Sequence, residues 1–189
     1  GNRKLWENCD VTAVEQDKQI ARIYKDNFPQ DEMIIADAHE YLQENYQFFD
    51  FIWSSRPCTT HTRIRQMMGV GRRGVKPVYP DFGLYEEIIF LQHNAKCFWV
   101  VENVNPYYEP LIKPTVRIKR HLFWSNFLIP SQVEIPRRNH EFARIGELEK
   151  QIGFEVRNYQ ISNKRQILRN CVAPELGNHV FEAMLRAQG

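Results

Sequence analysis

The stretch Asp50-Phe-Ile-Trp-Ser-Ser-Arg-Pro-Cys-Thr-Thr-His-Thr62 decides how the fold of this chain is interpreted. Its first part, Asp50 to Trp53, is a short apolar run of the kind that forms a buried parallel strand. Arg56-Pro57 ends that strand, because proline has no N–H to give to the ladder of hydrogen bonds. Cys58 is therefore expected just beyond the carboxyl end of a strand, which is the edge of an open α/β sheet where ligands bind.

A second predicted strand, Lys96 to Val101, runs straight into Glu102-Asn103-Val104. It places a carboxylic acid at the same sheet edge as the Cys58 thiol. A nucleophile and a proton donor at neighbouring strand ends are typical of covalent catalysis. The alternative for any lone cysteine is a buried structural role, since free cysteine is among the most buried residue types. We assign that role to Cys9, Cys97 and Cys171 but not to Cys58, which lies between a proline and a basic segment.

The rest of the chain alternates between strand-like and helix-like segments, which predicts an α/β fold with a doubly wound, mostly parallel sheet and helices on both faces. Further strands are predicted over Cys9–Val14, Met33–Ile35 and His121–Phe127, and a short helix around Tyr41-Leu42. Longer helices are predicted over Asp17–Asn27, Leu84–His93, Phe142–Gln151 and Asn163–Asn170, and a closing helix follows Gly177-Asn178 and runs to Arg186.

Length and composition fit one globular domain over residues 1–189, with 43% hydrophobic and 25% charged residues. The net charge of +2 gives no global signal for nucleic acid, so any such signal must be local. The four cysteines are widely spaced and form no C-x-x-C pair, which favours a reduced cytoplasmic setting without a disulfide framework or a metal site. No apolar run approaches the roughly 20 residues that span a bilayer, and no signal peptide is evident.

A basic segment follows the predicted nucleophile. Residues 51–80 contain no acid, and glycines at 69, 71 and 74 make part of the segment flexible. A basic loop beside a catalytic cysteine suits contact with phosphates and closure over a substrate. The alternative is an ordinary solvated surface loop. We favour function, and the predicted DNA-binding residues are Arg63, Arg65, Arg72, Arg73 and Lys76.

Three motifs, in order and at fitting distances along nearly the whole chain, carry a family resemblance. Pro57-Cys58, Glu102-Asn103-Val104 and Gly177-Asn178-His179-Val180 resemble the Pro-Cys, Glu-Asn-Val and Gly-Asn-x-Val motifs of the DNA cytosine-C5 methyltransferases. The chain is similar to small bacterial or phage-type members, which implies the cytoplasm of a bacterial or phage-infected cell.

The resemblance implies a Rossmann-like methyltransferase fold that uses S-adenosylmethionine and acts on DNA. It implies that Cys58 attacks carbon 6 of a cytosine flipped out of the duplex, and that Glu102 holds or protonates the ring nitrogen at position 3. Arg120 aligns with the second arginine of an Arg-x-Arg pair that steadies the base and the acid, although Ile118 stands at the first. Arg56 stands where most members have a second proline, and we expect its charge to favour the Cys58 thiolate.

Two acids follow the first predicted strands and suit the cofactor. An acid at such a strand end commonly accepts hydrogen bonds from a ribose diol, which fits Glu15, and Asp37 suits an adenine amino group. The alternative is that both acids merely cap the helices that follow them. The resemblance implies that S-adenosylmethionine is bound by Gly1, Glu15, Asp37, Pro57 and Asn178.

The family begins with a strand and a glycine-rich turn, of which Gly1 matches the last glycine. We expect either that further residues precede Gly1 or that a partner completes the sheet.

The interval 129–161 stands where the family has a target-recognition domain. It is short and polar without an obvious second core, which predicts relaxed specificity or a specificity partner. Two other functions stay open at this point: a non-catalytic DNA-binding or regulatory relative, and a tRNA cytosine-C5 methyltransferase.

Overall fold

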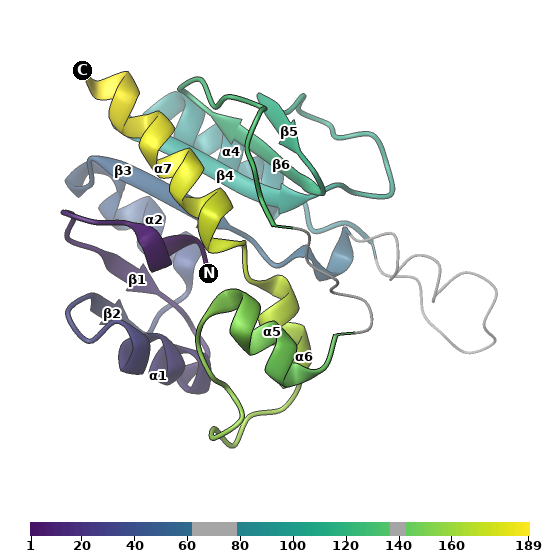
Figure 1. The fold of residues 1–189 in the computed structure, drawn as a ribbon. Helices are drawn as coiled ribbons and strands as arrows, with labels where there is room; N and C mark the ends of the chain where they lie inside the picture. The colour runs from purple at the N-terminus through teal and green to yellow at the C-terminus, as the bar shows by residue number, and fades with distance from the viewer. Residues whose placement is uncertain (62–78, 137–142) are drawn as a thin grey trace. The chain divides into compact units, whose positions relative to one another are not determined.

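The computed structural model describes residues 1–61, 79–136 and 143–189 (Figure 1). The chain divides into two compact units. Unit 1 comprises Gly1–Asn45 and Glu134–Glu182, and unit 2 comprises Tyr46–Val133 and Ala183–Gly189. The expectation of one domain over 1–189 with a short insert at 129–161 stays a prediction.

The first half of unit 1 is a parallel strand pair with its crossover helix. Strands β1 (Thr12–Val14) and β2 (Glu32–Ile34) pair in parallel with Ala13 opposite Met33. Helix α1 (Lys18–Asn27) connects them and begins after Asp17, whose side chain accepts hydrogen bonds from two backbone N–H groups of the first turn. Helix α2 (Ala38–Asn45) follows β2. The predicted strand–helix–strand order is confirmed here, with β1 shorter than expected and β2 one residue earlier than expected.

The second half of unit 1 is helical and has a core. It contains α5 (Ile145–Ile152), α6 (Lys164–Asn170) and the first part of α7 (Pro174–Gln188). The short helix η1 (Asn2–Leu5) belongs to the first half. The interval 129–161 was expected to have no obvious second core of its own, and its buried residues pack with residues of α1 and α6 in one shared cluster. The members are Ile23, Ala143, Leu148, Ile152, Val156 and Leu168.

Unit 2 is built on a four-stranded sheet in the order β3-β4-β6-β5. Its strands are β3 (Phe51–Ser55), β4 (Phe98–Val104), β5 (Val116–Ile118) and β6 (His121–Ser125). Only β3 and β4 pair in parallel, whereas β6 is antiparallel to both β4 and β5. The sheet is therefore mixed, and the expectation of a mostly parallel sheet is wrong for this unit. The cause is a tight turn at Lys119, which has a φ of 54° and reverses the chain between β5 and β6.

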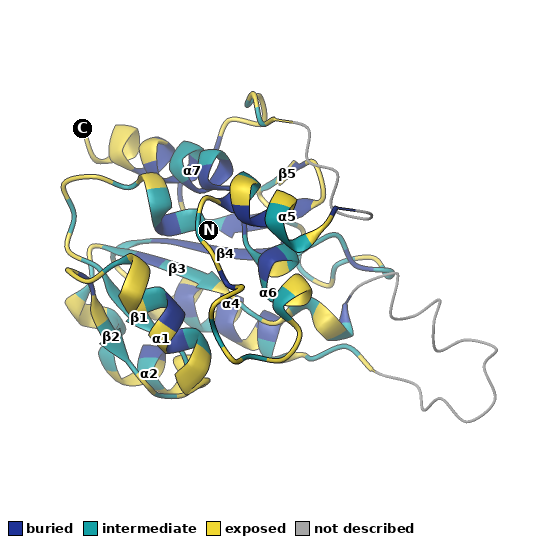
Figure 2. Cartoon of the chain, turned by 60° about the horizontal axis from the view of Figure 1, so that its bottom comes forward, coloured by how far each residue is buried: buried dark blue, intermediate teal, exposed yellow. Residues whose placement is uncertain are grey.

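The core of unit 2 lies along β4. Residues Trp99 to Val101 of β4 and Phe123 of β6 are almost completely buried. In Figure 2 most of β4 is dark blue. Helix α4 (Gly83–Asn94) contributes Leu84, Ile88 and Leu91 to the buried set. The shorter helices η2 (Tyr46–Phe48) and η3 (Cys58–Thr60) flank β3 in the chain.

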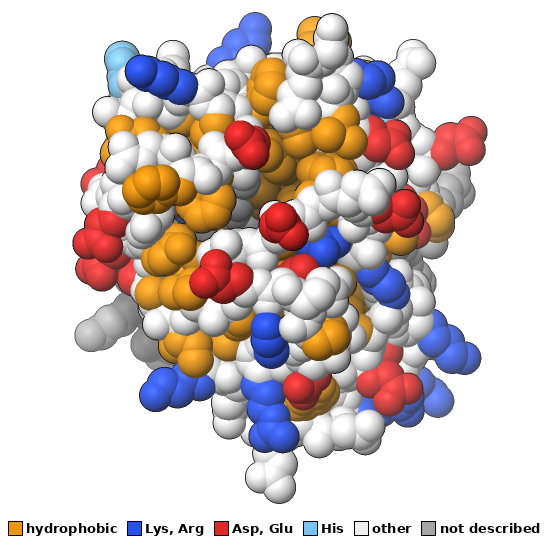
Figure 3. Space-filling model, turned by 90° about the vertical axis from the view of Figure 1, so that its left-hand side faces the viewer, with side chains coloured by type: hydrophobic (Ala, Val, Ile, Leu, Met, Phe, Trp, Pro, Cys, Tyr) orange, Lys and Arg blue, Asp and Glu red, His pale blue; other side chains and the backbone are white. Residues whose placement is uncertain are grey.

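The surface agrees with the nearly balanced charge of the chain. On the face drawn in Figure 3, Lys and Arg side chains are interspersed with Asp and Glu side chains and with hydrophobic ones. Among the helices in the described part of the chain, none is long and apolar enough to cross a membrane.

Candidate active site

Cys58 lies in a short turn after β3. The strand ends at Ser55, two residues later than predicted, and Cys58 opens the three-residue helix η3. Pro57 precedes it with a φ of −54°, and the His61 N–H donates to the Cys58 carbonyl at 3.0 Å. The thiol therefore follows the carboxyl end of a parallel strand, as the sequence predicts.

Glu102 belongs to β4 itself, because this strand continues to Val104 instead of ending at Val101. It continues because β6 pairs with it, with Val104 opposite His121. On the other side Glu102 lies opposite Ser55, the last residue of β3. Glu102 is 5% exposed, and its Oε2 accepts a hydrogen bond of 2.9 Å from the Ser55 hydroxyl. Trp53 Nε1 donates to the same hydroxyl oxygen at 2.8 Å, which directs the Ser55 proton to Glu102.

His121 is the residue of this site that sequence reasoning missed. Its Nδ1 lies 2.6 Å from Glu102 Oε1, and both side chains are buried. No local signal in the sequence could have found it, because the contact follows from the register of two strands: Phe123 lies opposite Glu102 across β4 and β6, and residues two apart on a strand share a face. A histidine at the start of an otherwise apolar strand thereby faces the acid.

Arg120 fixes which nitrogen of His121 carries the proton. Arg120 Nε donates to His121 Nε2 at 3.3 Å, and arginine remains protonated in proteins. Nε2 therefore accepts, and Nδ1 carries the proton that it donates to Glu102. Sequence reasoning assigned the support of the acid to Arg120, but the direct contact is made by His121. Glu102 thus accepts one hydrogen bond on each oxygen, from His121 and from Ser55.

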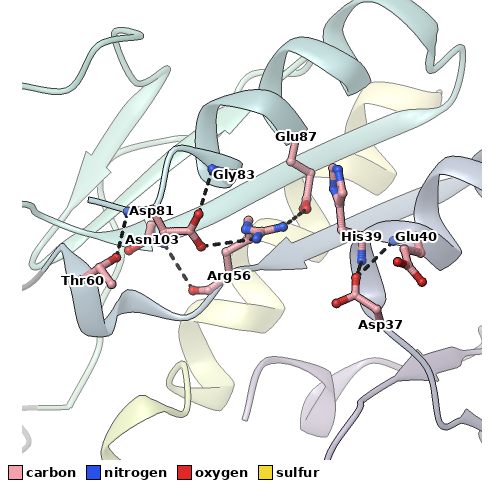
Figure 4. Close-up of polar contacts among 9 residues, drawn as sticks. All are labelled: Asp37, His39, Glu40, Arg56, Thr60, Asp81, Gly83, Glu87 and Asn103. Carbon is pink, nitrogen blue, oxygen red and sulfur yellow. Dashed lines mark hydrogen bonds and ion pairs between the residues drawn. The ribbon is translucent and has the colours of Figure 1, made fainter. Parts of the chain in front are cut away.

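The electrostatics of Cys58 differ from expectation. Burial raises the pKa of the Cys58 thiol, the charge of Glu102 raises it further, and the charge of Arg120 opposes both. Arg56 was expected to favour the thiolate, but its guanidinium is paired with Asp81 and Glu87 (Figure 4), and the charge that lowers the pKa of Cys58 is that of Arg120. The thiol, Glu102 and Arg120 nonetheless lie within electrostatic range of one another.

The predicted cofactor acids lie in unit 1, each beyond the carboxyl end of a paired strand. Glu15 directly follows β1, and its Oε1 accepts from the Asp17 N–H at 2.9 Å. Asp37 follows β2, and its Oδ1 accepts from the N–H groups of His39 and Glu40 at the start of α2 (Figure 4). Asp37 therefore caps helix α2, which is the alternative role for an acid at a strand end. Glu15 and Asp37 nevertheless follow neighbouring parallel strands, so both lie at the same edge of the β1–β2 pair.

The Gly-Asn motif is placed differently from expectation. Helix α7 begins at Pro174, so Gly177 and Asn178 lie within its first turns and not before it. Gly177 permits close approach, because a Cβ there would collide with the backbone of Asn2. Asn178 Nδ2 donates to Glu182 Oε1 at 2.8 Å.

The other predicted ligands are distributed over both units and beyond. Gly1 lies in unit 1 and packs against the Val172 carbonyl, while Pro57 lies in unit 2 beside the nucleophile. The predicted DNA-binding residues Arg63, Arg65, Arg72, Arg73 and Lys76 lie outside the described residues. All four cysteines are free thiols. In residues 1–61, 79–136 and 143–189 no group of three or more His, Cys, Asp or Glu side chains is placed to hold a metal ion.

Comparison with known proteins gives a distant structural likeness. No protein-family model and no curated protein matches the chain. Solved structures do match, among them a mutant of Spodoptera frugiperda DNMT2. That likeness covers 54% of this chain and 30% of that chain, with 21% sequence identity and a TM-score of 0.32.

Proposed function

We propose that this chain transfers a methyl group from S-adenosylmethionine to carbon 5 of cytosine in DNA, on a Rossmann-like methyltransferase fold. The observation that supports it most is the pairing of Ser55 with Glu102 across β3 and β4. This register brings a buried acid to the turn that carries Cys58, and the thiol senses the charge of that acid. The three motifs described above connect the same residues to cytosine chemistry.

The Cys58 thiolate attacks carbon 6 of the ring and forms a C–S bond, while the electrons of the 5,6 double bond make carbon 5 nucleophilic. Negative charge that develops at nitrogen 3 and the position-2 oxygen is relieved when Glu102 donates or shares a proton. After methyl transfer, solvent takes the proton from carbon 5 and nitrogen 3 returns its proton to Glu102. The restored 5,6 double bond expels the Cys58 sulfur. Since carbon 6 is inaccessible in a duplex, the base must be flipped out.

Glu102 also offers a reason for the choice of cytosine. Its carboxyl group accepts hydrogen bonds from His121 and Ser55, which fixes its plane. Each oxygen retains a second lone pair, so one oxygen can share the proton at nitrogen 3 while the other accepts from the exocyclic amino group of cytosine. Thymine and uracil present a carbonyl at that position, which would leave two acceptors facing each other.

S-Adenosylmethionine would supply an electrophilic methyl group when bound. Two acids of unit 1 fit the polar groups of this cofactor, because Glu15 and Asp37 lie at the carboxyl edge of β1 and β2. Glu15 would accept hydrogen bonds from the ribose diol, and Asp37 would accept one from the adenine amino group. Gly1, Pro57 and Asn178 are the further proposed contacts, and Arg63, Arg65, Arg72, Arg73 and Lys76 would contact DNA phosphates.

The deciding experiment measures methyl transfer by the purified full-length protein to DNA and to tRNA side by side. We expect product on DNA and a covalent adduct on DNA that contains 5-fluorocytosine, because fluorine blocks the loss that releases the enzyme. Cys58→Ser should abolish both while retaining DNA binding, and Cys97→Ser should retain both. Product on tRNA alone would replace the proposed substrate. DNA binding without cofactor binding or transfer would indicate a non-catalytic relative.

A further inference from the structure

The turn that carries Cys58 has little backbone support of its own. Pro57 has no N–H, and η3 covers only the three residues Cys58–Thr60. A 3-10 helix this short has poor hydrogen-bond geometry. The position of the thiol therefore depends on the contacts that the neighbours of Cys58 make with other elements of unit 2.

Arg56 makes such a contact from the side before the turn. Its Nη1 lies 3.2 Å from Glu87 Oε2 and its Nη2 lies 3.3 Å from Asp81 Oδ2. Figure 4 draws both contacts. The Glu87 side chain is only 4% exposed, so its charge needs a partner. Burial works against the charge of Arg56, but Glu87 and Asp81 outweigh burial and raise the pKa of the guanidinium.

Asp81 also holds the side after the turn. Its N–H donates to Thr60 Oγ1 at 3.1 Å, and its Oδ1 accepts from the N–H of Gly83, the first residue of α4, at 3.0 Å. The residues two before and two after Cys58 are thus both tied to Asp81. Burial would raise the pKa of Asp81, but the Gly83 N–H and Arg56 outweigh it and lower that pKa.

Asn103 links this network to the acid. Its Nδ2 donates to the Arg56 carbonyl at 3.3 Å, and it is 2% exposed in the middle of the sheet. Asn103 directly follows Glu102 in β4. The carbonyl of Arg56 therefore connects the Cys58 turn to β4, the strand that carries Glu102. The side chain of Arg56 connects the same turn to Glu87 in α4.

We propose that Arg56 is a positioning residue that, with Asp81 and Glu87, fixes the thiol of Cys58 relative to Glu102 and so sets the rate of attack on the base. The inference rests on the proposed function, because the rate concerned is that of methyl transfer. A proline at position 56 would restrict the backbone before Cys58 through its ring, but it could not pair with the buried carboxylate of Glu87. Arg56 restricts the same backbone through the ion pairs of its side chain with Asp81 and Glu87.

The test compares Arg56→Gln and Arg56→Lys with the control Arg22→Gln in the full-length protein. Arg22 is a matched control because its side chain is 78% exposed and lies 3.9 Å from Asp26. In Arg56→Gln the single-turnover rate of methyl transfer should fall at least about tenfold with DNA affinity within about twofold, since small misplacement of a reacting group is costly. Arg56→Lys should recover part of the rate, because lysine keeps the charge but lacks the fork that reaches two carboxylates.

A second measurement does not depend on methyl transfer. In a background with Cys9, Cys97 and Cys171 replaced by serine, iodoacetamide should alkylate Cys58 at least about threefold faster in Arg56→Gln, because a loosened turn exposes the thiol. If the wild type transferred no methyl group, the proposed function would fail, while this alkylation rate would still decide on the positioning role.

If Arg56→Gln fails to fold, Asp81→Asn takes its place, since the Asp81 side chain is 43% exposed and tolerates the change better. The same losses are expected in Asp81→Asn. A folded Arg56→Gln or Asp81→Asn protein with wild-type methyl transfer, or with an unchanged alkylation rate of Cys58, would overturn the inference.

Discussion

His121 Nδ1 donates a hydrogen bond of 2.6 Å to Glu102 Oε1, and these two buried side chains come from neighbouring antiparallel strands. The contact joins the predicted acid to a residue that none of the sequence motifs contains. Since Arg120 donates to the other ring nitrogen, Nδ1 is the nitrogen that faces Glu102 as a donor. His121 therefore orients the Glu102 side chain.

The first prediction concerns this contact. His121→Phe leaves a buried carboxylate oxygen without its donor, which costs about 1.5–3 kcal/mol for a hydrogen bond to a charged group. We expect a lower melting temperature and a single-turnover rate reduced at least about tenfold, because the plane of Glu102 is no longer fixed. His121→Asn should recover part of the rate, since its amide N–H can take the place of Nδ1–H. The exposed His93 provides the control substitution His93→Phe. Equal rates for the wild type and His121→Phe would exclude the orienting role.

The second prediction concerns the pH dependence of the nucleophile in the absence of substrate. Because burial and Glu102 raise the pKa of Cys58, its thiolate fraction at neutral pH is lower than that of a free thiol and increases as pH rises. In the variant that retains Cys58 as its one cysteine, the alkylation rate should increase with a midpoint above about 8.5, the ordinary thiol value. Arg120→Gln removes the opposing charge and should move the midpoint higher. A midpoint below 8, a rough limit set against that ordinary value, would contradict this account.

The third prediction uses Glu102→Gln, which should have opposite effects in two assays. Methyl transfer should slow by about a hundredfold or more, the usual scale for a positioned proton donor. Alkylation of free Cys58 should accelerate, because the negative charge that raises the thiol pKa is removed. A loss of both reactivities would indicate general damage to the fold, and circular dichroism of the variant would detect it.

The sequence predicted the positions of Cys58 and Glu102 in the fold better than it predicted the pairing of the sheet. The turn at Pro57-Cys58 could be predicted because proline ends a strand locally, and Glu102 because it follows an apolar run. The antiparallel hairpin of β5 and β6 could not, since it depends on a positive φ at Lys119, a residue that rarely adopts one. His121 and the Arg56–Asp81–Glu87 network could not be predicted either, because both depend on registers and contacts between segments far apart in the chain.

The fourth prediction concerns the stability of unit 1. Arg3 donates through Nε and Nη2 to both oxygens of Asp31 at 3.0 and 2.9 Å, and the Tyr24 hydroxyl donates to the same carboxylate at 2.7 Å. The side chains of Arg3 and Asp31 are 9% and 1% exposed, so the pair is withdrawn from water. Asp31→Asn leaves Arg3 buried without its counter-charge, which costs about 3–5 kcal/mol. Thermal unfolding should show a clearly lower midpoint, while Asp26→Asn at the surface should change it little. An unchanged midpoint in Asp31→Asn would show that water replaces the pair.

The last prediction concerns sequence specificity and the interval 129–161. Among its described cations, Arg157 Nε lies 2.6 Å from the buried carboxylate of Glu149, whereas Arg144 before α5 and Lys150 within it are exposed. Arg137 and Arg138 lie outside the described residues.

Each bidentate base contact contributes about 1–3 kcal/mol of discrimination, so one or two such contacts define a short or degenerate site. We therefore expect the protein alone to methylate cytosine in many sequence contexts, with a sharper choice only in the presence of a specificity partner. Bisulfite sequencing of plasmid DNA methylated by the purified protein measures this directly. Modification confined to one defined site of about four base pairs or more would mean that this chain reads sequence by itself, because that requires several contacts at once.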